Sequence, residues 1–227
     1  MTIEQMKEQI FTVNERDFES LALDIFKYQA EHIPIYKQYI SLLGKDARAI
    51  SCLEEIPFLP ISFFKNNVVC DQPINPDQLP FFQSSGTTSQ QNSRHYIIDF
   101  ELYKSSFRKG FEMFFGKPEQ YVILGLLPSY IENGHSSLVY MVNDLIHQSS
   151  QAESGFYLYD VEKLSTGIKK LEAEGRKTLL IGVTYALLDF ASQFVGQLHH
   201  TSIIETGGMK GRREEWTRME VHAYLKR

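Results

Sequence analysis

Residues 84–89 place five hydroxyl side chains around one glycine, and this is the segment of the chain best suited to chemistry. The six residues are Ser84, Ser85, Gly86, Thr87, Thr88 and Ser89. The glycine lets the backbone turn sharply and approach a ligand closely. Backbone N–H groups and hydroxyls gathered at such a turn can surround the oxygens of a phosphate. Ser, Thr and Gly also suit the turn of a hairpin that binds nothing, so both interpretations stay open.

Further polar candidates stand in three segments that follow short apolar runs. His135 and Ser136 belong to the segment 128–137, and Gly182 and Thr184 flank Val183. The third segment contains Glu205, Thr206, Gly207, Gly208 and Lys210. Lys210 follows two glycines and could meet an anion, or it could be a solvated loop lysine. His135 could likewise lie in a cleft or on the surface.

Several common signatures are absent. No Gly-x4-Gly-Lys-Ser/Thr segment occurs, which excludes the Walker phosphate loop. The segment 207–211 is not a Gly-x-Gly-x-x-Gly turn, and Gly134-His135-Ser136 begins like a nucleophile elbow but lacks the closing glycine. An acyltransferase based on Ser136 therefore stays a third hypothesis. The seven histidines show no metal-binding spacing, so the sequence predicts no protein-held metal site.

Composition limits the class of protein. The 227 residues are 43% hydrophobic and 13% aromatic, which is enough for a sizeable core. The net charge of −5 argues against a nucleic-acid partner. Cys52 and Cys70 form no Cys-x-x-Cys pattern, no signal peptide is recognisable, and no apolar run is long enough to cross a bilayer. These features predict a soluble, cytoplasmic protein.

The elements expected before the hydroxyl-rich segment are helical and then proline-rich. Amphipathic patterns predict helices over 14–32 and 35–43, the second ending at Gly44. Five prolines between 57 and 80 prevent long helices there. We therefore expect residues 1–80 to form a helical and proline-rich segment packed on a core built from residues 81–227.

From residue 94 onward, short apolar runs alternate with amphipathic helices. Strands are expected at 94–98, 121–126, 156–159, 178–182 and 202–205, and helices at 100–115, 136–147, after the capping residue Asp160, at 184–194 and at 212–227. Such alternation predicts an α/β fold with a largely parallel sheet flanked by helices. The loops 128–137, 182–184 and 206–211 should then share one sheet edge, where ligands of such sheets bind.

The segment 84–89 resembles the phosphate loop of adenylate-forming enzymes, usually written Thr/Ser-Ser-Gly-Thr-Thr-Gly. The surrounding sequence is similar to the LuxE-type acyl-protein synthetases, the fatty-acid-activating component of bacterial bioluminescence reductase systems. The similar segments occur in family order and span most of the chain. They are 57–65, 83–95, 127–130, 136–141 and 205–211.

The resemblance implies the N-terminal domain of an adenylate-forming enzyme and a two-step reaction. ATP, with Mg²⁺, and a carboxylic acid give an acyl-adenylate and pyrophosphate, and the acyl group then passes to a thiol. By resemblance, Ser84–Ser89 hold the phosphates, and Glu205–Gly208 lie along the adenine and ribose. His135, Ser136, Gly182 and Thr184 are the expected substrate pocket. Coenzyme A or an acyl-CoA reductase-type protein is the expected partner.

The chain also departs from the family pattern. Ser89 replaces the usual last glycine of the phosphate loop, and Asn92 stands where many relatives carry lysine, a charge that Arg94 could supply. The Tyr-Gly-x-Thr-Glu motif, the ribose-binding aspartate and the lid lysine have no counterpart, and neither cysteine matches the acylated one. We therefore expect the front part of such a ligase, inactive alone. The alternative is a non-catalytic nucleotide- or acyl-binding module.

Overall fold

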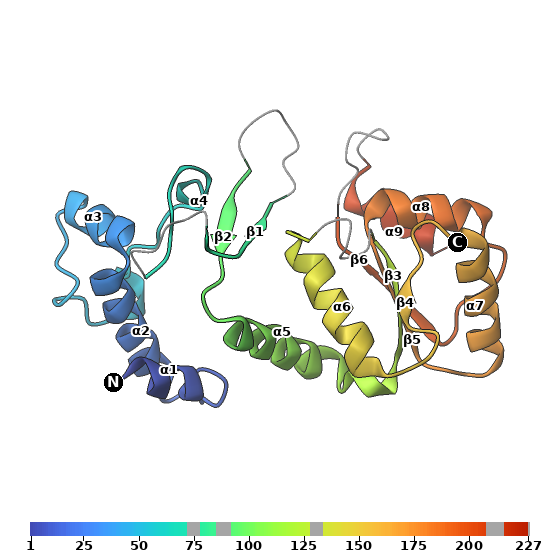
Figure 1. Ribbon diagram of the computed structural model, residues 1–227, viewed down its shortest axis with the longest axis horizontal. Helices are drawn as coiled ribbons and strands as arrows, with labels where there is room; N and C mark the ends of the chain where they lie inside the picture. Colours follow the sequence, from blue (N-terminus) through green and yellow to red (C-terminus); the bar gives the residue numbers. More distant parts are fainter. Residues whose placement is uncertain (72–77, 85–91, 128–133, 208–215, 227) are drawn as a thin grey trace. The chain divides into compact units, whose positions relative to one another are not determined.

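The computed structural model describes residues 1–71, 78–84, 92–127, 134–207 and 216–226 (Figure 1). By its internal contacts the chain divides into two compact units, Met1–Lys109 and Gly110–Arg227. The division expected near residue 80 separates an N-terminal segment from the core on which it packs, within one structural domain, and it stays a prediction. No helix in the described ranges is long and apolar enough to cross a membrane.

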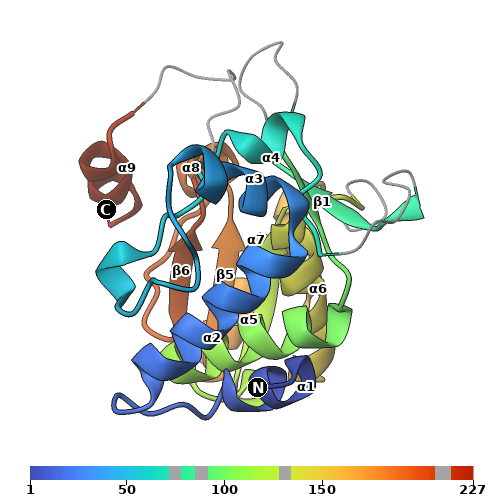
Figure 2. The same cartoon turned by 90° about the vertical axis from the view of Figure 1, so that its left-hand side faces the viewer.

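The first unit begins with helices. They are α1 (Ile3–Gln9), α2 (Phe18–His32), α3 (Pro34–Leu42), the 3-10 turn η1 (Leu53–Glu55) and α4 (Phe63–Asn66). Helices α2 and α3 pack through a small core in which Phe26 and Tyr36 meet edge to face, with ring centroids 6.1 Å apart (Figure 2). This core explains why both amphipathic patterns form helices.

A hairpin follows the proline-rich segment. Strands β1 (Phe81–Gln83) and β2 (Arg94–Tyr96) pair antiparallel, with Gln83 opposite Arg94. In the sequence, the hydroxyl-rich segment begins directly after the end of β1 and precedes the start of β2. Helix α5 (Phe100–Phe115) comes next and has the bounds that the sequence predicts.

The second unit is a four-stranded parallel sheet with helices between the strands. After η3 (Pro118–Gln120), its elements are β3 (Val122–Leu126), α6 (Ser137–Ser149), β4 (Gly155–Phe156), α7 (Val161–Ala173), β5 (Thr178–Gly182), α8 (Thr184–Gln193), β6 (Thr201–Glu205) and α9 (Arg218–Leu225). The strand order is β4-β3-β5-β6. Helix α6 covers one face of the sheet, and α7 and α8 cover the other (Figure 1).

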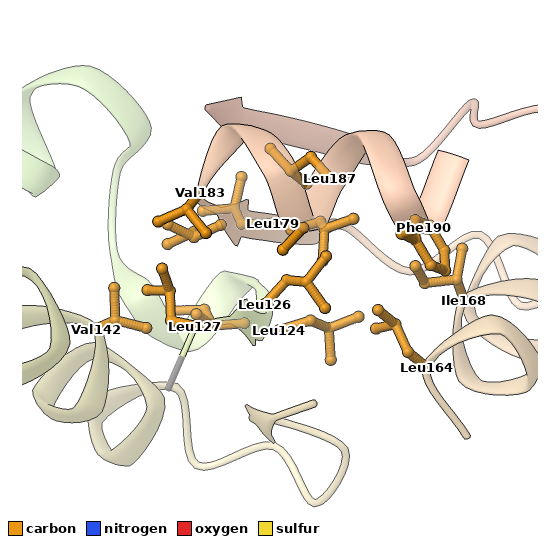
Figure 3. Packing of buried hydrophobic residues seen from close by; sticks show 14 of the residues in the cluster. Leu124, Leu126, Leu127, Val142, Leu164, Ile168, Leu179, Val183, Leu187 and Phe190 are labelled. Carbon is orange, nitrogen blue, oxygen red and sulfur yellow. The ribbon is translucent and has the colours of Figure 1, made fainter. Parts of the chain in front are cut away.

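The core of this unit lies on both faces of β3 and β5. Every residue of these two strands is buried, which explains their continuous apolar runs. Leu164 and Ile168 of α7 and Leu187 and Phe190 of α8 belong to the same cluster (Figure 3). The α/β fold with a parallel sheet and N-terminal helices is therefore confirmed.

The element boundaries differ from the predicted ones where local contacts compete with periodicity. Helix α2 begins at Phe18 rather than residue 14, because the Asn14 side chain accepts the N–H of Arg16 at 2.9 Å and forms a turn. Strand β4 ends at Phe156, because residues 157–159 turn toward the Asp160 cap of α7. Helix α1 has no counterpart among the predicted elements, and it begins with a capping box at Thr2.

Candidate functional site

The chain reverses direction across the sheet between β3 and β5. From β3 it passes through α6 to β4 at one side, and it then crosses back through α7 to β5 at the other side. The segments that leave the adjacent carboxyl ends of β3 and β5 consequently lead to helices on opposite faces (Figure 1). Ligands of open parallel sheets bind in the crevice that such a reversal creates. This edge of the sheet is therefore the candidate ligand-binding region of the second unit.

A hydrogen-bonded acidic group lies at the same edge, between β5 and β6. The Oε1 atom of Glu205 accepts a hydrogen bond from the hydroxyl of Thr184 and another, of 2.7 Å, from the backbone N–H of Gly207. Thr184 is only 4% exposed, whereas Glu205 is half-buried. One carboxylate oxygen is thus held, and the side chain remains accessible from solvent.

Backbone contacts extend the pairing of β5 and β6 beyond the ends of the strands. The N–H and the hydroxyl of Thr206 both donate to the carbonyl oxygen of Gly182, each at 3.1 Å. The N–H of Thr184 donates to the carbonyl oxygen of Gly207 at 3.4 Å. The two sets of residues that the sequence assigned to separate roles, Gly182 with Thr184 and Glu205 with its successors, are therefore in direct contact.

The two glycines of this edge are needed for different reasons. A Cβ atom on Gly182 would lie 2.8 Å from Cγ of Leu187 and 3.1 Å from Cβ of Leu126, so a side chain here would force these leucines to move. Gly207 has a φ of +79° with open space around it, a backbone conformation that favours glycine. Gly182 allows α8 to approach the strand closely, and Gly207 turns the backbone so that its N–H meets Glu205.

His135 and Ser136 stand just before α6, on the segment that leaves β3. The hydroxyl of Ser136 caps this helix by accepting the N–H of Val139 at 3.3 Å. His135 is exposed. This contact gives Ser136 a structural role that is independent of any substrate.

The hairpin in the first unit holds the start of the hydroxyl-rich segment. Ser84 and Ser93 close it: the N–H of Ser84 donates to the carbonyl of Ser93 at 3.0 Å, and the N–H of Ser93 donates to the hydroxyl of Ser84 at 3.1 Å. The guanidinium of Arg94 stacks over Phe81, 4.7 Å from the ring centroid. The strand expected at 94–98 is present as β2, which ends at Tyr96, and it pairs with β1, which the sequence did not predict as a strand.

The remaining candidates, Ser85, Gly86, Thr87, Thr88, Ser89, Gly208 and Lys210, lie outside the described residues. Their predicted phosphate, adenine and anion contacts stay predictions. Among the described residues, no group of three or more His, Cys, Asp or Glu side chains could hold a metal ion.

A second anchored carboxylate, which was not among the residues predicted from the sequence, lies on α7. The carboxylate of Glu172 accepts a hydrogen bond from the backbone N–H of His199 at 2.8 Å and one from that of His200 at 3.0 Å. It also accepts a hydrogen bond from the hydroxyl of Thr201 at 2.6 Å. Burial alone would raise the pKa of Glu172, but these hydrogen bonds outweigh it and hold the pKa below its ordinary value. The contact fixes the start of β6. No sequence signal marks it, because the partners are far apart along the chain.

Comparison of the chain with protein-family models, with curated proteins and with solved structures found no match. The resemblance to acyl-protein synthetases therefore rests on its motifs alone.

Proposed function

We propose that this chain binds ATP·Mg²⁺ and takes part in activating a carboxylic acid, a fatty acid by resemblance, as an acyl-adenylate for transfer to a thiol. The single observation that best supports the proposal is the Glu205 carboxylate, held by Thr184 and Gly207 where parallel strands end. It lies next to the crevice in which such sheets bind ligands.

In the proposed complex, Glu205 accepts hydroxyl hydrogens of the ribose. An anchored carboxylate is suited to this, because Thr184 and Gly207 fix its orientation before the ligand arrives. The absence of a side chain at Gly207 leaves the backbone open to a flat base. Ser84–Ser89 donate N–H and hydroxyl hydrogens to the phosphates, and His135, Ser136, Gly182 and Thr184 border the substrate carboxylate.

The proposed chemistry consists of two displacements. An oxygen of the substrate carboxylate attacks the α-phosphorus, a P–O bond forms, and the bond from that phosphorus to the bridging oxygen breaks as pyrophosphate leaves. A thiolate then attacks the acyl carbon, a C–S bond forms, and AMP leaves with the C–O electron pair. The contribution of the protein is positioning and the stabilisation of charge on the phosphates, with Mg²⁺ supplying part of the latter.

Isothermal titration with ATP·Mg²⁺ tests the nucleotide site. Glu205→Gln keeps an oxygen that can accept from Thr184 and Gly207 but removes the charge that orders the ribose hydroxyls. We expect roughly tenfold weaker binding of ATP, because the variant loses about one hydrogen bond to a charged group. Glu119→Gln is the matched control, because Glu119 is exposed and precedes β3 at the opposite end of the sheet. Equal affinity of the wild type and Glu205→Gln would refute the assignment of Glu205.

Exchange of labelled pyrophosphate into ATP separates the two functions. Carboxylate-dependent exchange supports the ligase. ATP binding without exchange supports a nucleotide-binding module instead. Binding of a fatty acid that shifts the amides of Gly182 and Thr184, with no binding of ATP, would leave only the acyl-binding module.

A further inference from the structure

A cavity of about 510 Å³ lies beside α7, lined also by Leu124 of β3 and by Glu153 and Tyr157 on either side of β4, and neither the sequence motifs nor the proposed nucleotide site uses it. Strands β4 and β6 are the two edge strands of the sheet, so the cavity and Glu205 lie toward opposite edges. Its volume falls within the range of roughly 300–1,000 Å³ that small-molecule pockets occupy. The lining residues from α7 that the argument uses are Lys163, Thr166, Gly167 and Lys170.

The inner wall of the cavity is apolar. Leu124, Leu164 and Leu171 lie at its base and are 2%, 1% and 0% exposed, so the cavity reaches the surface of the core. Leu124 and Leu164 belong to the cluster drawn in Figure 3. Tyr157 forms a further wall, and its hydroxyl is fixed by donating to the carbonyl of Glu153 at 2.6 Å. An apolar group would be dry against this wall.

A glycine in the middle of α7 keeps the cavity open. Gly167 lines it, and a Cβ atom built there would meet no atom within 4 Å. Alanine inside a helix is more stable than glycine by about 1 kcal/mol. Neither packing nor a positive φ therefore requires a glycine here, and the missing side chain leaves the space beside the helix open to a ligand.

Five charged residues line the cavity: the acids Glu153, Asp160 and Glu162, of which Glu162 is exposed to solvent, and the bases Lys163 and Lys170. The carboxylate of Glu153 accepts from Arg176 at 2.9 Å and from Lys170 at 3.4 Å, and Asp160 caps α7 by accepting the N–H of Lys163 at 3.0 Å. The ammonium of Lys163 lies 5.6 Å from the centroid of the Tyr157 ring and makes no ion pair with the described residues. This cation therefore stands above the apolar wall, able to donate to an anion.

We propose that this cavity binds a small amphipathic carboxylate, with the hydrocarbon part against Tyr157, Gly167 and the buried leucines and the carboxylate at Lys163. The site goes beyond the proposed nucleotide function and does not depend on it. A ligand here contacts both α7 and the turn that leads into it, so its binding would hold these two segments together.

Titration of the isotope-labelled chain with sodium octanoate, followed by amide NMR without nucleotide, tests the proposal. We expect saturable shifts at Tyr157 and along 162–171, and weaker binding of octylamine, which carries the opposite charge. Gly167→Leu fills the cavity and should weaken octanoate roughly tenfold, because the ligand loses its apolar wall. Lys163→Met should weaken it roughly threefold, the size of the contribution of an exposed ion pair.

Lys169→Met is the matched control, because Lys169 is on the same helix and stands 5.7 Å from the centroid of a different ring, Phe194. It should leave octanoate binding unchanged. Circular dichroism verifies the fold of each variant. If Gly167→Leu does not fold, the octanoate affinities of the single variants Gly167→Ala and Lys163→Met test the proposal instead. The absence of saturable shifts, wild-type affinity in a folded Gly167→Leu variant, or equal binding of octylamine would overturn the proposal.

Discussion

One substitution, glycine to alanine, should have three different effects at three positions of the second unit. At Gly182 the new methyl group would lie 2.8 Å and 2.9 Å from Cγ and Cδ2 of Leu187, and 3.1 Å from Cβ of Leu126. Carbon atoms attract one another at about 3.5–4.0 Å, so all three contacts are repulsive. Leu187 is 0% exposed and Leu126 is 1% exposed, and neither can move into solvent.

The magnitudes follow from these surroundings. Overpacking of a filled core costs about 1–3 kcal/mol, so Gly182→Ala should lower the free energy of unfolding by about that amount. Gly207→Ala meets no atom within 4 Å but must keep a φ of +79°, which costs roughly 1–2 kcal/mol. Gly167→Ala meets open space in a helix and should raise the free energy of unfolding by about 1 kcal/mol.

Urea denaturation followed by fluorescence of Trp216, the chain's one tryptophan, measures these changes in the second unit. The urea concentration at the midpoint should be highest for Gly167→Ala, lower for the wild type, and lowest for Gly182→Ala and Gly207→Ala. Wild-type stability of Gly182→Ala would refute the close approach of α8 to β5. Destabilisation by Gly167→Ala would refute the open space beside α7.

Two further predictions concern hydrogen bonds. Glu172→Gln should destabilise the second unit by about 1 kcal/mol, because an amide accepts the hydrogen bonds of Thr201 and its neighbours less strongly than a carboxylate. The folded pKa of Glu172 is below the ordinary 4.5, so the stabilisation by its carboxylate is complete above pH 4.5 and is lost as the pH falls through the folded pKa. The urea midpoints of the variant and the wild type should therefore differ at pH 7 and converge as the pH is lowered toward 3. Ser136→Ala should cost about 1 kcal/mol by removing the cap on Val139, whereas Ser136→Asp should restore it, and a chemical-denaturation series of the three proteins decides.

The fold could be predicted from sequence where apolar runs and helical periods agree. Strand β5 and helix α5 have the predicted bounds, because Thr178–Gly182 is buried on both faces and the pattern of Phe100–Phe115 is long. The strand predicted at 156–159 ends at Phe156, because Tyr157 and the residues after it form a turn. This turn is held by the hydrogen bond from the Tyr157 hydroxyl to the carbonyl of Glu153, which a periodic sequence pattern does not reveal. The order β4-β3-β5-β6 likewise depends on long-range pairing rather than on local pattern.

The candidate site was predictable as a set of strand ends but not as a network. Rules for parallel sheets bring Thr184 and Glu205 to one edge, and they do lie there. Their direct hydrogen bond, and the anchoring of Glu172 by Thr201, depend on side-chain geometry between residues far apart in sequence. The cavity beside α7 left one sequence clue, a glycine inside an amphipathic helix at Gly167.

Amide NMR of the labelled chain during titration with ATP·Mg²⁺ tests the proposed nucleotide site most directly. We predict saturable shifts at Gly182–Thr184 and at Thr206 and Gly207, with the shifts at these residues weakened by Glu205→Gln and unchanged by Glu119→Gln. A titration that leaves the amides at the ends of β5 and β6 unmoved, at ATP concentrations up to the millimolar range of weak ligands, would contradict the assignment of this edge to a nucleotide.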